Sequence, residues 1–165
     1  MNEYSILIGG KAGFGIDKAG SIIAGILNEL GYRIYVYRDY PSLIRGGHTF
    51  SIIRASNQKI SAYRDNVDFL LALNQDTVNF HEKRIKDKSG IIYDADSVKS
   101  SGIGIPLAKI VQDENAPEIM RNSCIIGAFC KAAGIEWETL NEAFRKNISK
   151  ELELNLKVAK RGYEA

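Results

Sequence analysis

The sequence lacks the features that mark several large classes of protein. Its 22 lysine and arginine residues are interspersed with 20 aspartate and glutamate residues, which leaves a net charge of only +2. Because there is no long basic run, the composition does not favour nucleic acid as a partner. No apolar run approaches the roughly 20 residues that a transmembrane helix requires, so we expect no contact with a membrane either.

Cysteine is also scarce. The two cysteines, Cys124 and Cys130, lie six residues apart in a segment with helical periodicity, where they fall on different faces and fit no zinc or iron–sulfur spacing. We therefore expect no metal site in this chain. Two free thiols, and a beginning that does not resemble a signal sequence, predict a reducing compartment, the cytoplasm.

The length and the apolar content are sufficient for one core. With 165 residues, of which 45% are apolar, we expect a single domain over residues 1–165. An apolar strand at 4–8 is followed by the glycine-rich stretch GGKAGFGIDKAG at 9–20 and then by helical spacing that ends at Gly31. The β-branched and aromatic residues at 33–38 predict a second strand, which completes a βαβ unit.

The same patterns continue along the chain. Leucines in KELELNLKV (150–158) alternate as they would in a strand, but the Lys, Glu and Ala content and the length favour a helix. The sum predicts an α/β protein, a three-layer sandwich with a mainly parallel (mixed) sheet, Rossmann-like, with a helical C-terminal third and a ligand crevice at the carboxyl ends of the strands. The remaining strands are expected at 50–56, 67–73 and 90–95, and the remaining helices at 76–88, after Pro106, and near 118–133, 136–147 and 149–162.

The glycine-rich stretch does not match the common nucleotide-binding motifs. Its glycine spacing is that of a P-loop, but Ile16 and Asp17 stand where the lysine and hydroxyl residue are needed, so we expect no ATP or GTP hydrolysis. The dinucleotide motif fails because Lys18 occupies the third glycine position. Asp39, near the end of the second strand, could still hold a ribose hydroxyl, which leaves a nicotinamide or flavin site open.

Two interpretations of the glycine stretch remain. The amide N–H groups at a helix N-terminus, with Lys11 in the loop and Lys18 one turn inside, would attract an anion. Alternatively, Gly13 and Gly15 only allow the helix to pack closely on the sheet.

A second unusual segment, YPSLIRGGHTF, runs from 40 to 50. Its proline and paired glycines predict a contact loop, although Arg45 could be a solvated charge and His48 a polar residue satisfied by the fold. His48 is not expected to act as a catalytic base, because no serine, cysteine or carboxylate partner can be assigned to it.

Several stretches in order carry a resemblance to a known family. GGKAGFGI with a following AG, then YPSLIRGGHTFSIIRAS, then VDFLLALN, resemble the gamma subunit or gamma domain of 2-oxoacid:ferredoxin oxidoreductases, most closely those of 2-oxoglutarate and related 2-oxoacids. The similarity continues through IPLAKI, RNSCIIGAF and NLKVAKRGYEA. It implies a complex that converts a 2-oxoacid and coenzyme A to acyl-coenzyme A and carbon dioxide, passing two electrons to ferredoxin, flavodoxin or a similar carrier.

The resemblance also implies which parts this chain supplies. The sequence has no cysteine motif for a cluster and no diphosphate–magnesium motif. The resemblance therefore assigns thiamine diphosphate, magnesium and the iron–sulfur clusters to the alpha, beta and ferredoxin-like partner subunits, and no catalytic residue to this chain. The chain would help to form the coenzyme A site and would pack against its partners, with a homodimer possible when it is isolated. The alternative is a stand-alone Rossmann-like nucleotide-binding or regulatory module.

The site residues implied by the resemblance come from both loops. Many family loops read GGQG, whereas this loop reads KAG and places the cation Lys11 there, which suits an anion. Arg45 could make a bidentate contact to a phosphate or to a partner carboxylate. The expected coenzyme A contacts are Gly10, Lys11, Ala12, Gly13, Phe14, Gly15, Ser42 and Arg45, and the expected partner-facing residues are Tyr40, Gly46, Gly47 and His48.

Overall fold

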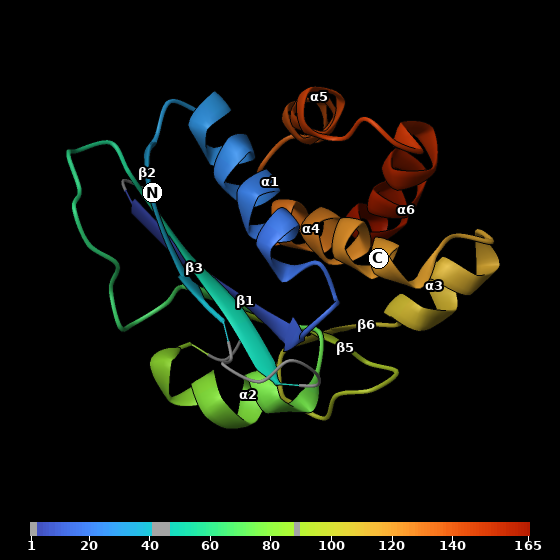
Figure 1. Cartoon of the computed structure of the whole chain (residues 1–165), viewed down its shortest axis with the longest axis horizontal. Coiled ribbons are helices and arrows are strands. Elements are labelled where there is room, and N and C mark those ends of the chain that lie inside the picture. Colours follow the sequence, from blue (N-terminus) through green and yellow to red (C-terminus); the bar gives the residue numbers. More distant parts are fainter. Residues whose placement is uncertain (1–2, 41–46, 88–89) are drawn as a thin grey trace.

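A mixed β-sheet organises the chain. A computed structural model describes residues 3–40, 47–87 and 90–165. In this part of the chain, six strands form one sheet in the order β2-β3-β1-β4-β5-β6 (Figure 1). The strands are β1 (Glu3–Lys11), β2 (Arg33–Asp39), β3 (His48–Ser56), β4 (Phe69–Ala72), β5 (Ile91–Asp94) and β6 (Ile103–Ile105). The helices are α1 (Ile16–Glu29), α2 (Gln75–His81), α3 (Leu107–Asp113), α4 (Arg121–Ala132), α5 (Trp137–Asn147) and α6 (Leu152–Glu164), with short 3-10 turns at Glu82–Arg84 and Glu118–Met120.

One strand runs against the others. β3 pairs antiparallel with both β1 and β2, while the β1–β4, β4–β5 and β5–β6 pairs are parallel. The prediction of a mainly parallel, mixed sheet is confirmed. The strands of the β1-α1-β2 unit are nevertheless not neighbours in the sheet, because β3 lies between them. The sequence did not reveal this insertion, since it depends on which edge the returning strand pairs with.

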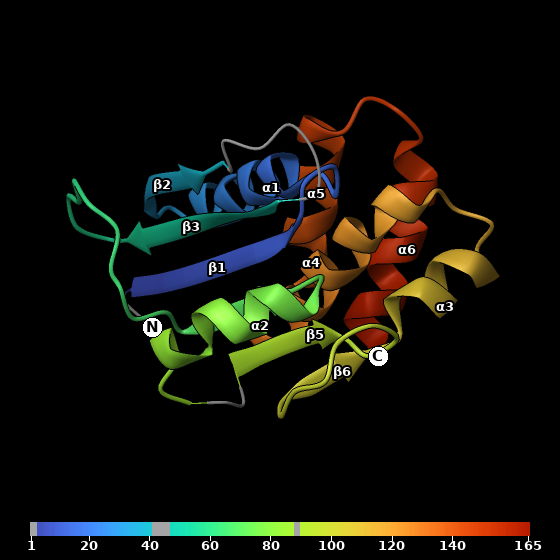
Figure 2. The same ribbon diagram turned by 60° about the horizontal axis from the view of Figure 1, so that its bottom comes forward.

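The helices cover the two faces of the sheet unequally. α1 and α4 pack on one face, with α5 and α6 behind them, while α2 lies on the other face (Figure 2). The alternation along β1 follows this division, because Ile6 and Ile8 belong to the large core under α1 and α4, whereas Leu7 belongs to a smaller core with Ile52 and Leu70. The predicted three-layer α/β sandwich is confirmed, with one thick and one thin helical layer.

Most predicted elements are present, with shifted ends. The KELELNLKV segment is helical within α6, as its composition favoured, and buries Leu156, Val158, Ala159 and Gly162. The helix predicted at 76–88 is shorter, because α2 ends at His81 and continues only as a 3-10 turn. The three-residue strand β6 was not predicted. It carries too few residues to show a period of two.

Two glycines bring α4 and α6 unusually close together. A Cβ added to Gly127 would lie 2.0 Å from the carbonyl oxygen of Ala159, and a Cβ added to Gly162 would lie 2.0 Å from that of Cys124. These neighbours are backbone atoms, which cannot move aside as a flexible side chain can. The two helices therefore cross with each glycine against the backbone of the other helix, and this contact fixes the position of α4 over the sheet.

We predict that Gly127→Ala and Gly162→Ala each destabilise the protein by about 3 kcal/mol, because the added methyl group forces the helices apart. Urea unfolding at neutral pH measures the change. Gly25→Ala in α1 is the matched control, since its Cβ would meet the side chain of Asn147 at 3.2 Å and the substitution improves helix propensity. If Gly25→Ala lowered the free energy of unfolding as much as Gly127→Ala does, the close backbone contact would not be the cause.

Candidate functional site

The glycine stretch forms the connection between β1 and α1 at the carboxyl end of the sheet. The amide of Phe14 donates to the carbonyl oxygen of Lys11 (3.0 Å), which closes a tight turn, and Gly13 and Gly15 have φ values of 95° and 68°. These left-handed conformations are strained for other residues. The amide of Ala12 donates to the carbonyl oxygen of Gly47 (2.9 Å). The structure thus joins the glycine loop to the second motif directly through the backbone.

The glycines of this loop do different things. A Cβ on Gly9 would lie 2.7 Å from Oγ1 of Thr77, and one on Gly10 would lie 2.9 Å from Cδ1 of Ile16, so these two permit close packing. A Cβ on Gly13 would meet none of the described residues within 4 Å. Gly13 therefore serves the shape of the turn, and its surroundings are open. Gly15 is required both for the turn and for close packing, because it has a positive φ and lies against the side chain of Asn122.

Some backbone donors of the loop have no acceptor among the described residues. None of the described residues accepts a hydrogen bond from the amides of Gly13 or Gly15. The first-turn amides of α1 also have no acceptor within the helix, and Gly15, as the N-cap, supplies no side-chain cap. The positive end of the α1 dipole is therefore open to an anion.

Only one of the two predicted lysines lies at the loop. Lys11 is the last residue of β1 and borders the loop itself. Nζ of Lys18 donates to the carbonyl oxygen of Asn147 (2.7 Å), at the end of α5. Asp17 forms an ion pair with Arg38. The structure therefore assigns Lys11 to the loop and shows Lys18 tying α1 to α5.

Hollows lie on both sides of the glycine loop. A cavity of about 400 Å³, here called the Tyr40 cavity, lies between the loop, the start of α1, and β2 and β3. A cavity of about 260 Å³, here called the Asn122 cavity, lies between the loop and the start of α4. The Tyr40 cavity is lined by Ala12, Gly13, Gly15, Ile16, Asp17, Tyr40 and Thr49. The Asn122 cavity is lined by Lys11, Ala12, Gly13, Phe14, Leu73, Glu118, Ile119, Arg121 and Asn122.

The second motif is described in part. Tyr40 is 62% exposed and lines the Tyr40 cavity, and Gly47 accepts the hydrogen bond from Ala12. The predicted contacts Ser42 and Arg45, and the predicted partner-facing Gly46, lie outside the described residues. The two motifs are therefore adjacent at Tyr40 and Gly47.

His48 has a partner that the sequence analysis did not identify. Its Nε2 lies 2.9 Å from Nε2 of His81, at the end of α2, and the rings of Phe50 and Phe80 flank the pair. A hydrogen bond between two imidazoles needs one donor and one acceptor, so the pair carries a single shared proton position. Burial lowers the pKa of His48, and burial together with the neighbouring His48 lowers the pKa of His81 to about 4.

Asp39 does not face the glycine loop. Its Oδ2 accepts a hydrogen bond from the hydroxyl of Tyr37 (3.2 Å), which packs in the smaller core, away from α1. In addition, β3 separates β2 from β1. A ribose-binding carboxylate is expected on the strand beside the glycine loop, so this arrangement does not favour the dinucleotide interpretation.

The start of α4 contributes residues that sequence reasoning missed. Arg121 lies 3.4 Å from the buried Asp94 at the end of β5, and Ser123 donates to Oδ1 of Asn155 (2.6 Å) in α6. Between them, Nδ2 of Asn122 donates to the carbonyl oxygen of Phe14 (2.5 Å). Three consecutive polar residues at the start of an apolar, buried helix were the available signal, because buried polar side chains need partners.

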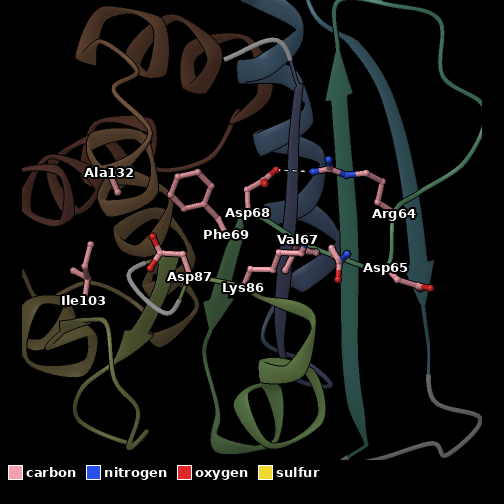
Figure 3. Close-up of a pocket in the computed structure, with 11 residues that line it drawn as sticks. Arg64, Asp65, Val67, Asp68, Phe69, Lys86, Asp87, Ile103 and Ala132 are labelled. Atoms are coloured by element: carbon pink, nitrogen blue, oxygen red, sulfur yellow. Dashed lines mark hydrogen bonds and ion pairs between the residues drawn. The ribbon is translucent and has the colours of Figure 1, made fainter.

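Another cavity lies at the opposite end of the sheet. It has a volume of about 800 Å³ and is bordered by the segments that lead into β4 and β5 (Figure 3). Figure 3 shows Arg64 directed toward Asp68, with which it forms an ion pair at 2.7 Å. The described lining includes Val67, Asp68 and Phe69 of the VDFLLALN stretch but no residue of the glycine stretch or of the 40–50 segment, so this cavity is not the predicted site.

The described residues carry no further reactive centre of the usual kinds. In ranges 3–40, 47–87 and 90–165, no group of three or more His, Cys, Asp or Glu residues is placed to hold a metal ion. Cys124 and Cys130 are both free and buried, and burial raises the pKa of Cys124 to about 12. None of the helices in these ranges has the length and hydropathy to cross a bilayer.

The fold and the loop together define a class: a mixed-sheet α/β domain with a glycine-rich turn at the carboxyl end of the first strand. The chain belongs to the pyruvate ferredoxin/flavodoxin oxidoreductase family, whose model matches residues 5–165. The family expectation from the sequence motifs is confirmed.

Similar sequences include whole subunits and much longer chains. The chain is 27% identical to 2-oxoglutarate synthase subunit KorC of Archaeoglobus fulgidus, over 98% of this chain and 87% of that protein. It is 35% identical to a 2-oxoacid:ferredoxin oxidoreductase subunit alpha of Sulfolobus sp. over 52% of this chain. The chain spans only 13% of the length of that alpha subunit and 15% of a relative from Aeropyrum pernix.

Solved structures share the fold. A 2-oxoglutarate:ferredoxin oxidoreductase of Magnetococcus marinus, solved with 2-oxoglutarate, coenzyme A and succinyl-coenzyme A bound, superposes with a TM-score of 0.85 at 23% identity, over 99% of this chain and 31% of that one. A keto/oxoacid ferredoxin oxidoreductase gamma subunit of Geobacter sulfurreducens superposes with a TM-score of 0.83 at 23% identity, over 99% and 96% of the two chains.

We predict that stability falls by about 2 kcal/mol between pH 7 and pH 5 because of the histidine pair. The pKa of His81 is lowered from 6.5 to about 4, so within this window the unfolded chain binds more protons than the folded one. The stability that the neutral pair contributes is present above pH 6.5 and is lost as the pH falls toward 4. Urea unfolding at several pH values measures it.

The variant His81→Gln removes the titrating group and should flatten the pH dependence. Because the chain has only two histidines, the ring signals of both can be followed by NMR in the same titration. The carboxylates of Asp39 and Asp76 favour protonation of the pair, and the Arg84 guanidinium opposes that of His81. An ordinary histidine titration near pH 6.5 would contradict the pairing.

Proposed function

We propose that this chain is the gamma component of a 2-oxoacid:ferredoxin oxidoreductase, in which it forms part of the coenzyme A site and of the subunit interface. The observation that carries the proposal is the hydrogen bond between Ala12 and Gly47, which joins the two family motifs into one site at the carboxyl end of the sheet. The match to the family over residues 5–165 supports it.

The residues at this site suit a phosphorylated ligand. The amides of Gly13 and Gly15, which have no acceptor among the described residues, the N-terminus of α1 and the ammonium of Lys11 are all donors that phosphate groups accept from. The open space beside Gly13 allows a ligand to approach the backbone. Coenzyme A, which is bound in the Magnetococcus marinus relative, carries a pyrophosphate and a further phosphate that fit such donors.

Among the described residues, those at the loop include no nucleophile beside a base, and we assign the chain a binding role. The residues that line the Tyr40 cavity and the Asn122 cavity provide amides, charges and apolar surface but no nucleophile beside a base. The chemistry of oxidative decarboxylation would be supplied by thiamine diphosphate with magnesium and by iron–sulfur clusters, which we assign to alpha, beta and ferredoxin-like partners. Ferredoxin or flavodoxin would accept the electrons.

Apolar side chains surround this end of the sheet. The three most exposed large hydrophobic residues among those described are Tyr40 and Phe80, both 62% exposed, and Ile119, 55% exposed. Tyr40 and Ile119 line the two cavities beside the loop, and Phe80 packs against His48. Such a surface favours burial by another polypeptide. We therefore propose that the partners cover the loop end of the domain, and that the assembled complex works in the cytoplasm.

A stand-alone nucleotide-binding module remains the alternative. It would use Asp39 for a ribose, but the position of Asp39 on the far side of β3 does not support that use. Titration of the chain with adenine dinucleotides separates the alternatives, because tight binding at equal stoichiometry favours the module.

We predict that co-expression with the alpha and beta chains of the same source gives a stable complex. This complex should reduce ferredoxin only when both a 2-oxoacid and coenzyme A are present, because the gamma chain completes the coenzyme A site. Affinity purification and spectrophotometric assay of ferredoxin reduction measure both properties. Failure of the chains to associate, with no gain in activity when this chain is added, would overturn the proposal.

We predict that Lys11→Glu raises the KM for coenzyme A about fivefold to a hundredfold, because it reverses a charge beside the ligand phosphates. Assembly should be unchanged. The control is Lys59→Glu, which makes the same change of net charge on an exposed residue beyond Ser56, while Lys11 pairs with His48 at the other end of β3. Steady-state kinetics of the assembled enzyme measure the effect, and equal KM values in both variants would assign the loop to packing alone.

A further inference from the structure

Asn122 contacts the glycine loop from a distant part of the chain. Its Nδ2 donates to the carbonyl oxygen of Phe14 at 2.5 Å and lies 3.4 Å from that of Gly15. The side chain is nearly buried, with an exposed fraction of 8%. The sequence separation between Asn122 and Phe14 is 108 residues. The contact is therefore a tertiary one and not part of the local turn.

These contacts set the direction of the loop amides. Trans peptide groups are planar and carry the C=O and the N–H on opposite sides. The structure contains no cis peptide among the described residues. Because Asn122 holds the carbonyl of Phe14, the N–H of Gly15 must point away from α4. The carbonyl of Gly15 accepts hydrogen bonds from Ala19 and Asn122, so the N–H of Ile16 points away as well.

The direction of the Gly15 and Ile16 amides agrees with the positions of the two cavities. Gly15 and Ile16 line the Tyr40 cavity, whereas Asn122 and Phe14 line the cavity on the opposite side. The amides that Asn122 turns outward therefore face the side on which the second motif enters at Tyr40. A ligand held by both motifs would contact this side of the loop and would reach Lys11, which lines the Asn122 cavity, across Gly13, which lines both cavities.

Nothing within the loop can replace this contact. The residue that caps α1 is Gly15, which has no side chain to fix the turn, and its φ of 68° is in a region that glycine leaves readily in either direction. Asn122 is itself held in place, because its neighbour Arg121 pairs with the buried Asp94 at the first turn of α4. The side-chain amide of Asn122 is therefore a fixed donor that restrains a flexible turn.

We propose that Asn122 is a positioning residue that holds the glycine loop in its binding conformation, with the amides of Gly15 and Ile16 directed toward the anionic ligand. This inference rests on the proposed function for the identity of the ligand, but not for the effect of Asn122 on the loop. Pre-arranged donors bind more strongly than donors that must first be ordered. Loss of Asn122 should therefore weaken binding without touching any reacting group.

The first experiment uses the full chain without ligand. Asn122→Leu keeps the branched shape of the side chain and removes the donor, and Asn122→Ala serves if the leucine variant does not fold. The matched control is Ser123→Ala, which removes the neighbouring buried hydrogen bond to Asn155 but no contact with the loop. In ¹⁵N NMR spectra, the amides of Gly13, Gly15 and Ile16 should shift and exchange faster with solvent in the Asn122 variants, and should stay unchanged in Ser123→Ala.

The second experiment uses the assembled enzyme. The Asn122 variants should raise the KM for coenzyme A about five- to tenfold and leave kcat within about twofold, because a lost loop contact affects binding and not chemistry. Ser123→Ala should leave both parameters unchanged, even where it lowers the melting temperature. Equal effects of Ser123→Ala and Asn122→Leu would show a merely structural role and overturn the inference.

The two experiments separate this inference from the proposed function. If the loop amides do not respond to Asn122→Leu, the inference is wrong, whatever the enzyme binds. If they respond but neither Lys11→Glu nor Asn122→Leu changes the KM for coenzyme A, the positioning of the loop stands and the assignment of its ligand fails.

Discussion

The antiparallel pairing of β3 with β1 is the constraint on which the site depends. The two strands run side by side from Glu3 opposite Ser56 to Lys11 opposite His48. Because antiparallel strands place the beginning of one beside the end of the other, this register brings the residues before β3 to the loop that follows β1. The hydrogen bond from Ala12 to Gly47 continues this antiparallel pairing one residue beyond the ends of the two strands. A parallel β3 would have put the two motifs at opposite ends of the sheet.

The thick helical layer completes the site from the other side. Close contact of Gly127 and Gly162 with facing backbone fixes α4 against α6, and the α4 start then reaches the end of β5, the glycine loop and α6 through three successive side chains. The loop is thus held by a strand neighbour on one side and a helix on the other. The glycines of the loop permit its tight turn, and the contacts with β3 and α4 restrain its conformation.

The chemistry of this arrangement is that of recognition. Backbone amides, one lysine and exposed apolar side chains are groups suited to a phosphorylated ligand and to another polypeptide, and the proposed function uses them for both. His48 and His81 are hydrogen-bonded to each other and flanked by Phe50 and Phe80 on the α2 side of the sheet. Their role in the structure is to join β3 to α2. In the proposed complex, this domain would act together with partners that cover its loop end.

The sequence by itself determined most of the strands and helices and the two loop motifs, because hydrophobic periodicity, helix propensity and glycine spacing are local properties of the chain. Even the segment with alternating leucines near the C-terminus forms the helix that its composition favoured, α6. The tertiary structure alone decided that β3 lies between β1 and β2, that Asp39 faces away from the glycine loop, and that Lys18 binds α5 rather than the loop. It alone revealed His81 and Asn122 as partners of the two motifs. These contacts join residues that are 33 and 108 positions apart, and their geometry follows from how whole elements pack, which no local pattern records.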